Sequence, residues 1–166
     1  MLPKELTNAL NNQMNHEFQA AHSYLAMASY FSQHSFHGFA NFYIVQAEEE
    51  RFHAMKFYHY LVSMGERPYF KGIEAPNNMH EGPLHIAEQS LEQENEVTRN
   101  IYALMDLAIE HKEHATIQFL HWFIDEQVEE EELFRGMIQK LKGISVGGDF
   151  FMTMDKEFSE RKLTTS

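Results

Sequence analysis

Four long segments of the chain repeat apolar residues with the period of an α-helix, and proline and glycine are concentrated between them. Apolar residues at heptad a and d spacing lie on one face of a helix, which must be buried against other helices. The first predicted helix begins near residues 3–6 and ends near residue 33. The next three predicted helices span about 39–65, 83–110 and 114–141. After the glycines at 143, 147 and 148, Asp149 is predicted to cap a short fifth helix that runs to about Arg161.

Residues 66–82 carry Pro68, Gly72 and Pro76 and are predicted to form a long crossover without helix or strand. A helix over 39–65 is about 40 Å long at 1.5 Å per residue, and the linker can extend to roughly 50 Å. The sequence therefore predicts an all-α fold, an antiparallel four-helix bundle with one long crossover and a short fifth C-terminal helix. We expect one domain, with the bundle at 1–145 and the fifth helix and tail at 146–166.

Each apolar stripe is interrupted by polar residues close to the middle of its helix. The interruptions are Glu17 in the first helix, Glu50 with His53 in the second, Glu94 in the third and Gln127 with Glu130 in the fourth. The middle of one helix in a bundle meets the middles of its neighbours, whichever way each helix runs. The sequence therefore predicts that these side chains converge inside the bundle.

Four converging carboxylates require positive charge, because an uncompensated buried carboxylate costs several kcal/mol or takes up a proton. None of the predicted core positions holds lysine or arginine, so two divalent cations are the expected counter-charge. The chain has no cysteine, so the ligands must be oxygen and imidazole, which suit manganese, iron or zinc better than copper. Glu50 and His53 are three residues apart and share one helix face, and Glu50 is the natural bridge between two metals.

Further polar residues lie close to these predicted ligands. Glu49, Glu126 and Glu129 are one turn or one residue away and could form an auxiliary metal site at the edge of the cluster. Tyr24 lies two turns after Glu17 on the same stripe, where it either packs in the core or donates a hydrogen bond or an electron to a metal centre. Gln127 replaces the ligand of a second Glu-x-x-His motif, which favours a site that releases one metal after oxidation.

The formal charge of −12 argues against nucleic acid and anionic membranes as partners, because both are negatively charged. The N-terminus lacks the apolar core of a secretion signal, and no run approaches the roughly 18 apolar residues of a membrane span. We therefore expect a cytoplasmic protein.

Taken together, the interrupting residues and their neighbours resemble the bacterial non-haem ferritins over essentially the whole chain. The residues that carry the resemblance are Asn15-His16-Glu17, Tyr24, Glu49-Glu50-Arg51-Phe52-His53, Glu94 and Asp125-Glu126-Gln127-Val128-Glu129-Glu130. The resemblance implies a ferritin-like fold and a ferroxidase centre that oxidises Fe(II) with dioxygen or peroxide. It also implies that ferric oxyhydroxide collects in a hollow shell of 24 subunits, whose four-fold channel the fifth helix lines.

The same resemblance implies the roles of individual residues. One iron would be held by Glu17, Glu50 and His53 and the second by Glu50, Glu94 and Glu130, with Gln127 close by. A third iron site would use Glu49, Glu126, Glu129 and Glu130.

The sequence differs from two related families, and these differences argue against haem binding and against a rubrerythrin. The haem-binding bacterioferritins carry methionine after the bridging glutamate and Glu-x-x-His in the fourth helix, whereas this chain has Arg51 and Gln127-x-x-Glu130, so we expect no haem. The rubrerythrins, di-iron proteins that reduce peroxide, carry a cysteine-rich electron-transfer module that this chain lacks. A metal-buffering or purely structural bundle without storage turnover remains the alternative.

Overall fold

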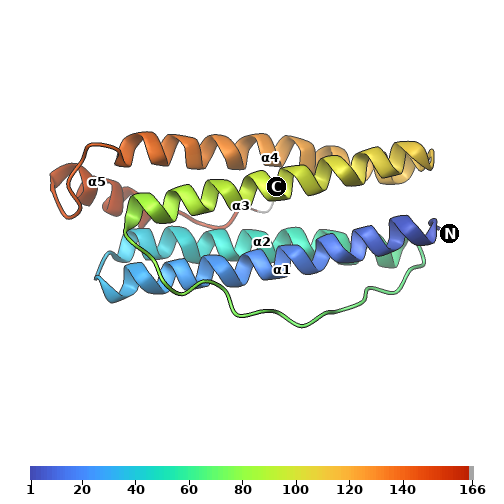
Figure 1. The fold of residues 1–166 in the computed structure, drawn as a ribbon, viewed down its shortest axis with the longest axis horizontal. Coiled ribbons are helices and arrows are strands. Elements are labelled where there is room, and N and C mark those ends of the chain that lie inside the picture. The colour runs from blue at the N-terminus through green and yellow to red at the C-terminus, as the bar shows by residue number, and fades with distance from the viewer. Residues whose placement is uncertain (165–166) are drawn as a thin grey trace.

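The computed structural model describes residues 1–164, which form five helices and no strand (Figure 1). The helices are α1 (Lys4–Gln33), α2 (His37–Ser63), α3 (Pro83–Glu110), α4 (His114–Leu141) and α5 (Asp149–Phe158). The predicted all-α fold with a four-helix bundle and a short fifth helix is confirmed. Among the described residues, no helix combines the length and the apolar character that crossing a membrane requires.

The connections between the helices determine their directions. Short turns join α1 to α2 and α3 to α4, and each turn contains one residue with positive φ, Ser35 and Lys112 respectively. The crossover between α2 and α3 follows the length of the bundle, so α2 and α3 run in the same direction while each short turn joins an antiparallel pair (Figure 1). This is the topology that the length of the linker predicts.

Side-chain amides of α1 hold the crossover against the bundle. Asn11 Oδ1 accepts a hydrogen bond from the backbone N–H of Tyr69 at 2.7 Å, and Asn15 Nδ2 donates to the carbonyl oxygen of Tyr69 at 2.8 Å. One turn later, Gln19 makes both bonds to the backbone of Glu74, at 2.8 and 3.0 Å. Because residues four apart share a helix face, these amides form a row to which the extended chain binds. The crossover has no regular structure, as predicted, but it is tied down at defined points.

The ends of two helices differ from the predicted bounds. Helix α2 spans His37–Ser63 rather than about 39–65, and α5 ends at Phe158 rather than 161. Asp149 is the first residue of α5 and not its cap, because Gly148 occupies the N-cap position and no side chain caps that end. The division into 1–145 and 146–166 of one domain stays a prediction, and its last two residues lie outside the described part of the chain.

The interior consists of two apolar clusters with a polar layer between them. One cluster, near α5, is built around Phe31 and Phe39, and the other, near the opposite end, around Leu10 and Phe57. The buried polar residues of the layer are Glu17, Gln46, Glu49, Glu50, His53, Glu94, Gln127 and Glu130. The heptad positions predicted for α1 and α4 are all buried. The stripes are therefore interrupted at one level, as the sequence indicates.

In α3, the heptad a and d spacing through Glu94 predicts two buried columns of residues, and one of the two is wrong. Ala87, Glu94, Ile101 and Ala108 are buried as predicted, but the alternating positions Leu84, Leu91, Thr98 and Met105 are only partly buried. The buried column lies one residue away and contains Ser90, Val97 and Leu104. Ser90 is buried without penalty because its hydroxyl donates to the carbonyl oxygen of Ile86 at 2.8 Å and contacts the hydroxyl of Tyr43 at 3.0 Å.

Helix α5 packs directly against the start of α2. Phe151 is fully buried and stacks on Phe39 with the ring centroids 4.6 Å apart. Asp155 Oδ1 accepts a hydrogen bond from the backbone N–H of Phe39 at 2.9 Å, so a residue of α5 caps α2 across the contact. A β-carbon on Gly38 would lie 1.5 Å from the carbonyl oxygen of Asp155. The approach of α5 therefore depends on glycine at position 38.

We expect Gly38→Ala to lower the free energy of unfolding by about 3 kcal/mol, because either α5 moves away or the contact is overpacked. Thermal unfolding by circular dichroism measures this loss. Gly136→Ala in α4 is the matched control, since no atom other than those of the adjacent residues and backbone of α4 lies within 4 Å of the added carbon. That control should raise stability by about 0.5–1 kcal/mol through its better helix propensity. Equal stability of the two variants would contradict the packing of α5 described above.

Candidate metal centre

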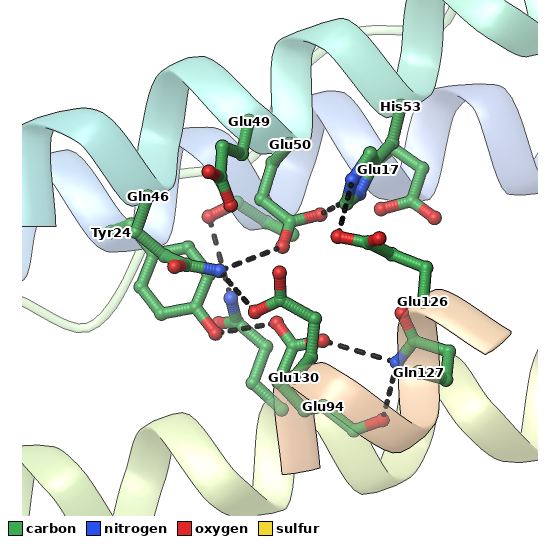
Figure 2. Close-up of polar contacts among 12 residues, drawn as sticks. Glu17, Tyr24, Gln46, Glu49, Glu50, His53, Glu94, Glu126, Gln127 and Glu130 are labelled. Carbon is green, nitrogen blue, oxygen red and sulfur yellow. Dashed lines mark hydrogen bonds and ion pairs between the residues drawn. The ribbon is translucent and has the colours of Figure 1, made fainter. Parts of the chain in front are cut away.

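The candidate metal centre lies in the polar layer, where all four long helices contribute side chains (Figure 2). Glu17, Glu50 and Glu94 are fully buried, and His53, Gln127 and Glu130 are nearly so. Six predicted interruptions of four separate stripes thus occupy one interior volume. They converge because their spacing along the chain matches the helical period and places them on the inward face of each helix.

Three groups of side chains each bring three ligand atoms within 4.8 Å of one another. The groups are Glu17 with Glu50 and His53; Glu50 with Glu94 and Glu130; and His53 with Glu126 and Glu130. The first two are the two ligand sets that the resemblance implies. Glu50 is common to both, which is the position a bridging carboxylate needs.

The carboxyl groups of the centre are poorly stabilised as anions. Burial raises the pKa of Glu50 well above its ordinary value, and the neighbouring Glu94 and Glu17 raise it further. Burial likewise raises the pKa of Glu130 well above the ordinary value, with Glu94 adding to the effect, and it raises the pKa of Glu94. Glu17 Oε2 is buried and has no hydrogen-bond partner. Each of these observations is expected of a site that binds cations.

His53 lies between two carboxylates. Its Nδ1 is 3.3 Å from Glu50 Oε2 and its Nε2 is 3.5 Å from Glu126 Oε1. Burial lowers the pKa of His53, but the hydrogen bond to Glu126 and the surrounding acids more than offset this, so the pKa is raised overall. The hydrogen bond with His53 lowers the pKa of Glu126. A metal would replace the imidazole proton, since imidazole binds metal in its neutral form.

Tyr24 and Gln127 both hold Glu94. The Tyr24 hydroxyl donates to Glu94 Oε1 at 2.6 Å, and Gln127 Nε2 donates to Glu94 Oε2 at 3.1 Å (Figure 2). Burial, with the charge of Glu94, raises the pKa of Tyr24 well above its ordinary value, so the phenol keeps its proton and acts as a donor. Tyr24 therefore packs in the core, where its ring stacks on that of Phe134, and also donates a hydrogen bond to a predicted ligand, whereas electron donation stays a prediction. Gln127 positions a carboxylate with its nitrogen rather than presenting its oxygen.

The heptad spacing places Gln46 in the core of α2, but sequence reasoning did not assign it to the centre. Its Nε2 donates to Glu130 Oε2 at 2.7 Å and lies 3.4 Å from Glu50 Oε1 (Figure 2). Gln13 plays a similar part in α1, where its Nε2 donates to Glu17 Oε1 at 3.0 Å. Each glutamine precedes its glutamate by one helical turn, which is the signal that could have identified both.

The predicted auxiliary residues line a cavity of about 340 Å³ beside the centre, here called the rim cavity. Its acidic lining consists of Glu49, Glu126, Glu129 and Glu130, and the tail after α5 contributes Arg161 and Lys162. The structure does not bring the four acids into one ligand group. Glu126 and Glu130 group with His53, Glu129 is exposed, and Glu49 pairs with Arg161 at 3.2 Å.

Within residues 1–164, no ion pair joins lysine or arginine to the core glutamates, which are Glu17, Glu50, Glu94 and Glu130. Hard oxygen donors, one imidazole and an unpartnered buried carboxylate oxygen fit divalent cations of the manganese, iron and zinc group. Two such ions would balance the four carboxylates. Fold and site together define a four-helix bundle protein with a buried group of carboxylates and one histidine that is compatible with a di-metal site.

Comparison with known proteins specifies the family. A model of the Ferritin-like domain matches residues 7–144. The chain is 48% identical over 166 residues to the bacterial non-heme ferritin of Staphylococcus saprophyticus, covering all of this chain and 99% of that protein. It is 47% identical over 161 residues to that of Staphylococcus aureus, covering 97% of each. The chain therefore belongs to the ferritin family.

Solved ferritin structures agree with this assignment. The fold matches an engineered closed form of the Archaeoglobus fulgidus ferritin with a TM-score of 0.96 and 36% identity, covering 99% of this chain and 100% of that one. It matches a humanized archaeal ferritin with a TM-score of 0.96 and 37% identity, covering 99% of each chain.

Proposed function

We propose that this chain stores iron after oxidising Fe(II) at the buried centre. Iron storage is the function of the family to which the chain belongs, and the ferroxidase step is our inference from the site. The observation that carries it is the position of Glu50, which is fully buried and shared by two groups of three ligand atoms. One carboxylate between two cations holds both substrate ions within reach of one oxidant molecule.

In this proposal, each residue has a defined part. Glu17, Glu50 and His53 bind one Fe(II), and Glu50, Glu94 and Glu130 bind the other. Each Fe(II) gives up one electron and becomes Fe(III). Dioxygen receives the pair with two protons from solvent and becomes hydrogen peroxide, or hydrogen peroxide receives the pair with two protons and becomes two water molecules. Gln46, Tyr24 and Gln127 keep the carboxylates oriented through the hydrogen bonds described above.

The two ligand groups of the centre differ, and this asymmetry supports release of the metal after oxidation rather than its permanent retention. The second group has three carboxylates and no imidazole, because Glu130 stands where a histidine would complete a second Glu-x-x-His motif, and Gln127 stands in place of its glutamate. The rim cavity, with Glu49, Glu126 and Glu129, offers further acidic ligands beside it. We propose that oxidised iron leaves the centre along this side and is deposited inside a shell of 24 subunits. The cytoplasmic location stays a prediction.

Aerobic loading with iron tests storage against metal buffering. We expect the assembled protein, isolated by gel filtration, to retain many more iron atoms per chain than the three ligand groups could hold. Iron content is measured by atomic absorption on the protein peak. Retention of three iron atoms or fewer per chain would instead support the metal-buffering alternative, and elution as a monomer would refute the shell.

A further inference from the structure

The tail after α5 returns along α2 and is held there at several points. Asn41 Nδ2 donates to the carbonyl oxygens of Phe158 and Arg161 at 2.9 and 3.1 Å. Arg161 Nη1 donates to the carbonyl oxygen of Phe42 at 2.9 Å, and its guanidinium carbon lies 4.1 Å from the centre of the Phe42 ring. The guanidinium group therefore has a fixed position although it belongs to a terminal segment.

At that position, the guanidinium group contacts the edge of the metal centre. Its Nη2 donates to Gln46 Oε1 at 2.8 Å and to Glu49 Oε2 at 3.2 Å. The side chains of Arg161 and Glu49 are only 17% and 12% exposed, so solvent screens this ion pair less than one on the open surface. Glu49 is thus neutralised by an arginine, whereas the core glutamates are not.

The contact with Gln46 extends the effect of Arg161 into the centre. Because the guanidinium group occupies the amide oxygen of Gln46, the amide nitrogen faces Glu130 Oε2 at 2.7 Å and Glu50 Oε1 at 3.4 Å. Arg161 is therefore linked to two predicted iron ligands through one buried amide. Without the guanidinium group, the side-chain amide of Gln46 could rotate and exchange the positions of its oxygen and nitrogen.

We propose that Arg161 is a positioning residue that occupies the Glu49 carboxylate as a tethered cation and thereby weakens metal binding in the rim cavity. The inference rests on the proposed function, because it concerns the path of iron away from the ferroxidase centre. A metal ion that uses Glu49 together with Glu126 or Glu130 must first displace the guanidinium group. Iron that reaches the rim cavity is consequently held weakly and passes on, instead of remaining as a permanent third ion.

The chemistry of arginine suits this role. A planar guanidinium group donates to two acceptors while stacking on an aromatic ring, which a lysine ammonium group cannot reproduce. Lys162 lines the same cavity but forms no ion pair with Glu49 among the described residues. Lys162 therefore provides a matched control for the loss of one positive charge at the cavity.

Terbium(III) luminescence measures metal binding in the rim cavity without any iron oxidation. Trp122, the single tryptophan, lines the cavity and can sensitise a bound terbium ion. We expect Arg161→Gln to bind terbium(III) about tenfold more tightly than the unmodified protein, and Arg161→Lys to show a smaller gain. Lys162→Gln should change the affinity by about twofold or less, as expected for an exposed charge. Equal affinities of the Arg161→Gln and unmodified proteins would overturn the proposal.

A double-mutant cycle with Glu49→Gln separates competition at Glu49 from a mere anchoring of the tail. If Arg161 acts through Glu49, Arg161→Gln gains little further affinity when Glu49→Gln is already present. An equal gain in terbium(III) affinity in both backgrounds would show that Arg161 only anchors the tail. That result would refute the role inferred for Arg161 but not the proposed function. Absence of sensitised terbium binding in the unmodified protein would refute the proposed metal path itself.

Discussion

The double variant Glu50→Ala with His53→Ala is expected to lose the rapid oxidation of Fe(II) in air. Every one of the three ligand groups contains Glu50 or His53, so none keeps three ligand atoms after both are removed. Without these ligands the two Fe(II) ions are no longer bound. Without the shared carboxylate of Glu50 they are no longer held close together. We expect a decrease of at least about 100-fold, towards the rate of Fe(II) in buffer. Stopped-flow absorbance after mixing with Fe(II) measures the rate.

The same helix provides a matched control for this experiment. Glu48→Ala with His59→Ala removes the same two residue types from α2, but both side chains are exposed and neither joins a ligand group among the described residues. The control should oxidise Fe(II) at nearly the rate of the unmodified protein. Circular dichroism verifies that both double variants remain helical. A rapid phase that persists in Glu50→Ala with His53→Ala would refute the ferroxidase assignment.

The main features of the centre could be predicted from the sequence because the helical period is a strong constraint. A polar residue at a predicted core position has only the bundle interior to occupy. When four helices of similar length are each interrupted near the middle, their polar residues must meet. Glu17, Glu50, His53, Glu94 and Glu130 are therefore placed correctly in the interior without any knowledge of tertiary contacts. Their binding of metal stays a prediction that the variants above test.

The same reasoning fails where packing or long-range placement decides the outcome. In α3, the heptad spacing predicts Leu91 rather than Ser90 in the core, yet Ser90 is the buried one because its hydroxyl finds local partners. The sequence predicts a last helix that runs to about Arg161, which does not assign the side chain of Arg161 to the centre. Only the return of the tail along α2, held by Asn41, brings that arginine to Glu49. No periodic pattern in the sequence encodes such a contact.

The metal-free protein should be less stable at neutral pH than in mild acid. The pKa values of Glu50, Glu94 and Glu130 are raised in the folded protein by burial, so the folded state binds their protons more tightly than the unfolded state does. The stabilisation that this gives is complete below pH 4.5, the ordinary glutamate pKa, and is lost as pH rises through the raised values. The raised pKa of His53 acts with the same sign above pH 6.5, whereas the lowered pKa of the half-buried Glu126 opposes the trend.

Glu94→Gln should therefore stabilise the metal-free protein at neutral pH, by about 1–3 kcal/mol, because glutamine cannot acquire the buried charge. Tyr24 can still donate to the new amide oxygen, and Gln127 can turn its own amide to accept from the new nitrogen. The gain should disappear below pH 4.5, where the glutamate is protonated. Thermal unfolding between pH 4 and 8 in the presence of a chelator measures the difference, with the exposed Glu96→Gln as the control.

Zinc(II) binds the same donors without redox chemistry. It should reverse the order of stability of the unmodified protein and Glu94→Gln. Ligand binding stabilises the folded state by RT ln(1 + [L]/Kd), so the protein that binds zinc more tightly gains more, and Glu94→Gln removes one carboxylate from the second ligand group. The unmodified protein should therefore gain more from zinc than the variant does and become the more stable of the two. If Glu94→Gln destabilised the metal-free protein at neutral pH, the buried carboxylates could not be the charged layer that metal neutralises. The same residues would then be held by internal hydrogen bonds alone, and their burial would indicate structure rather than a binding site.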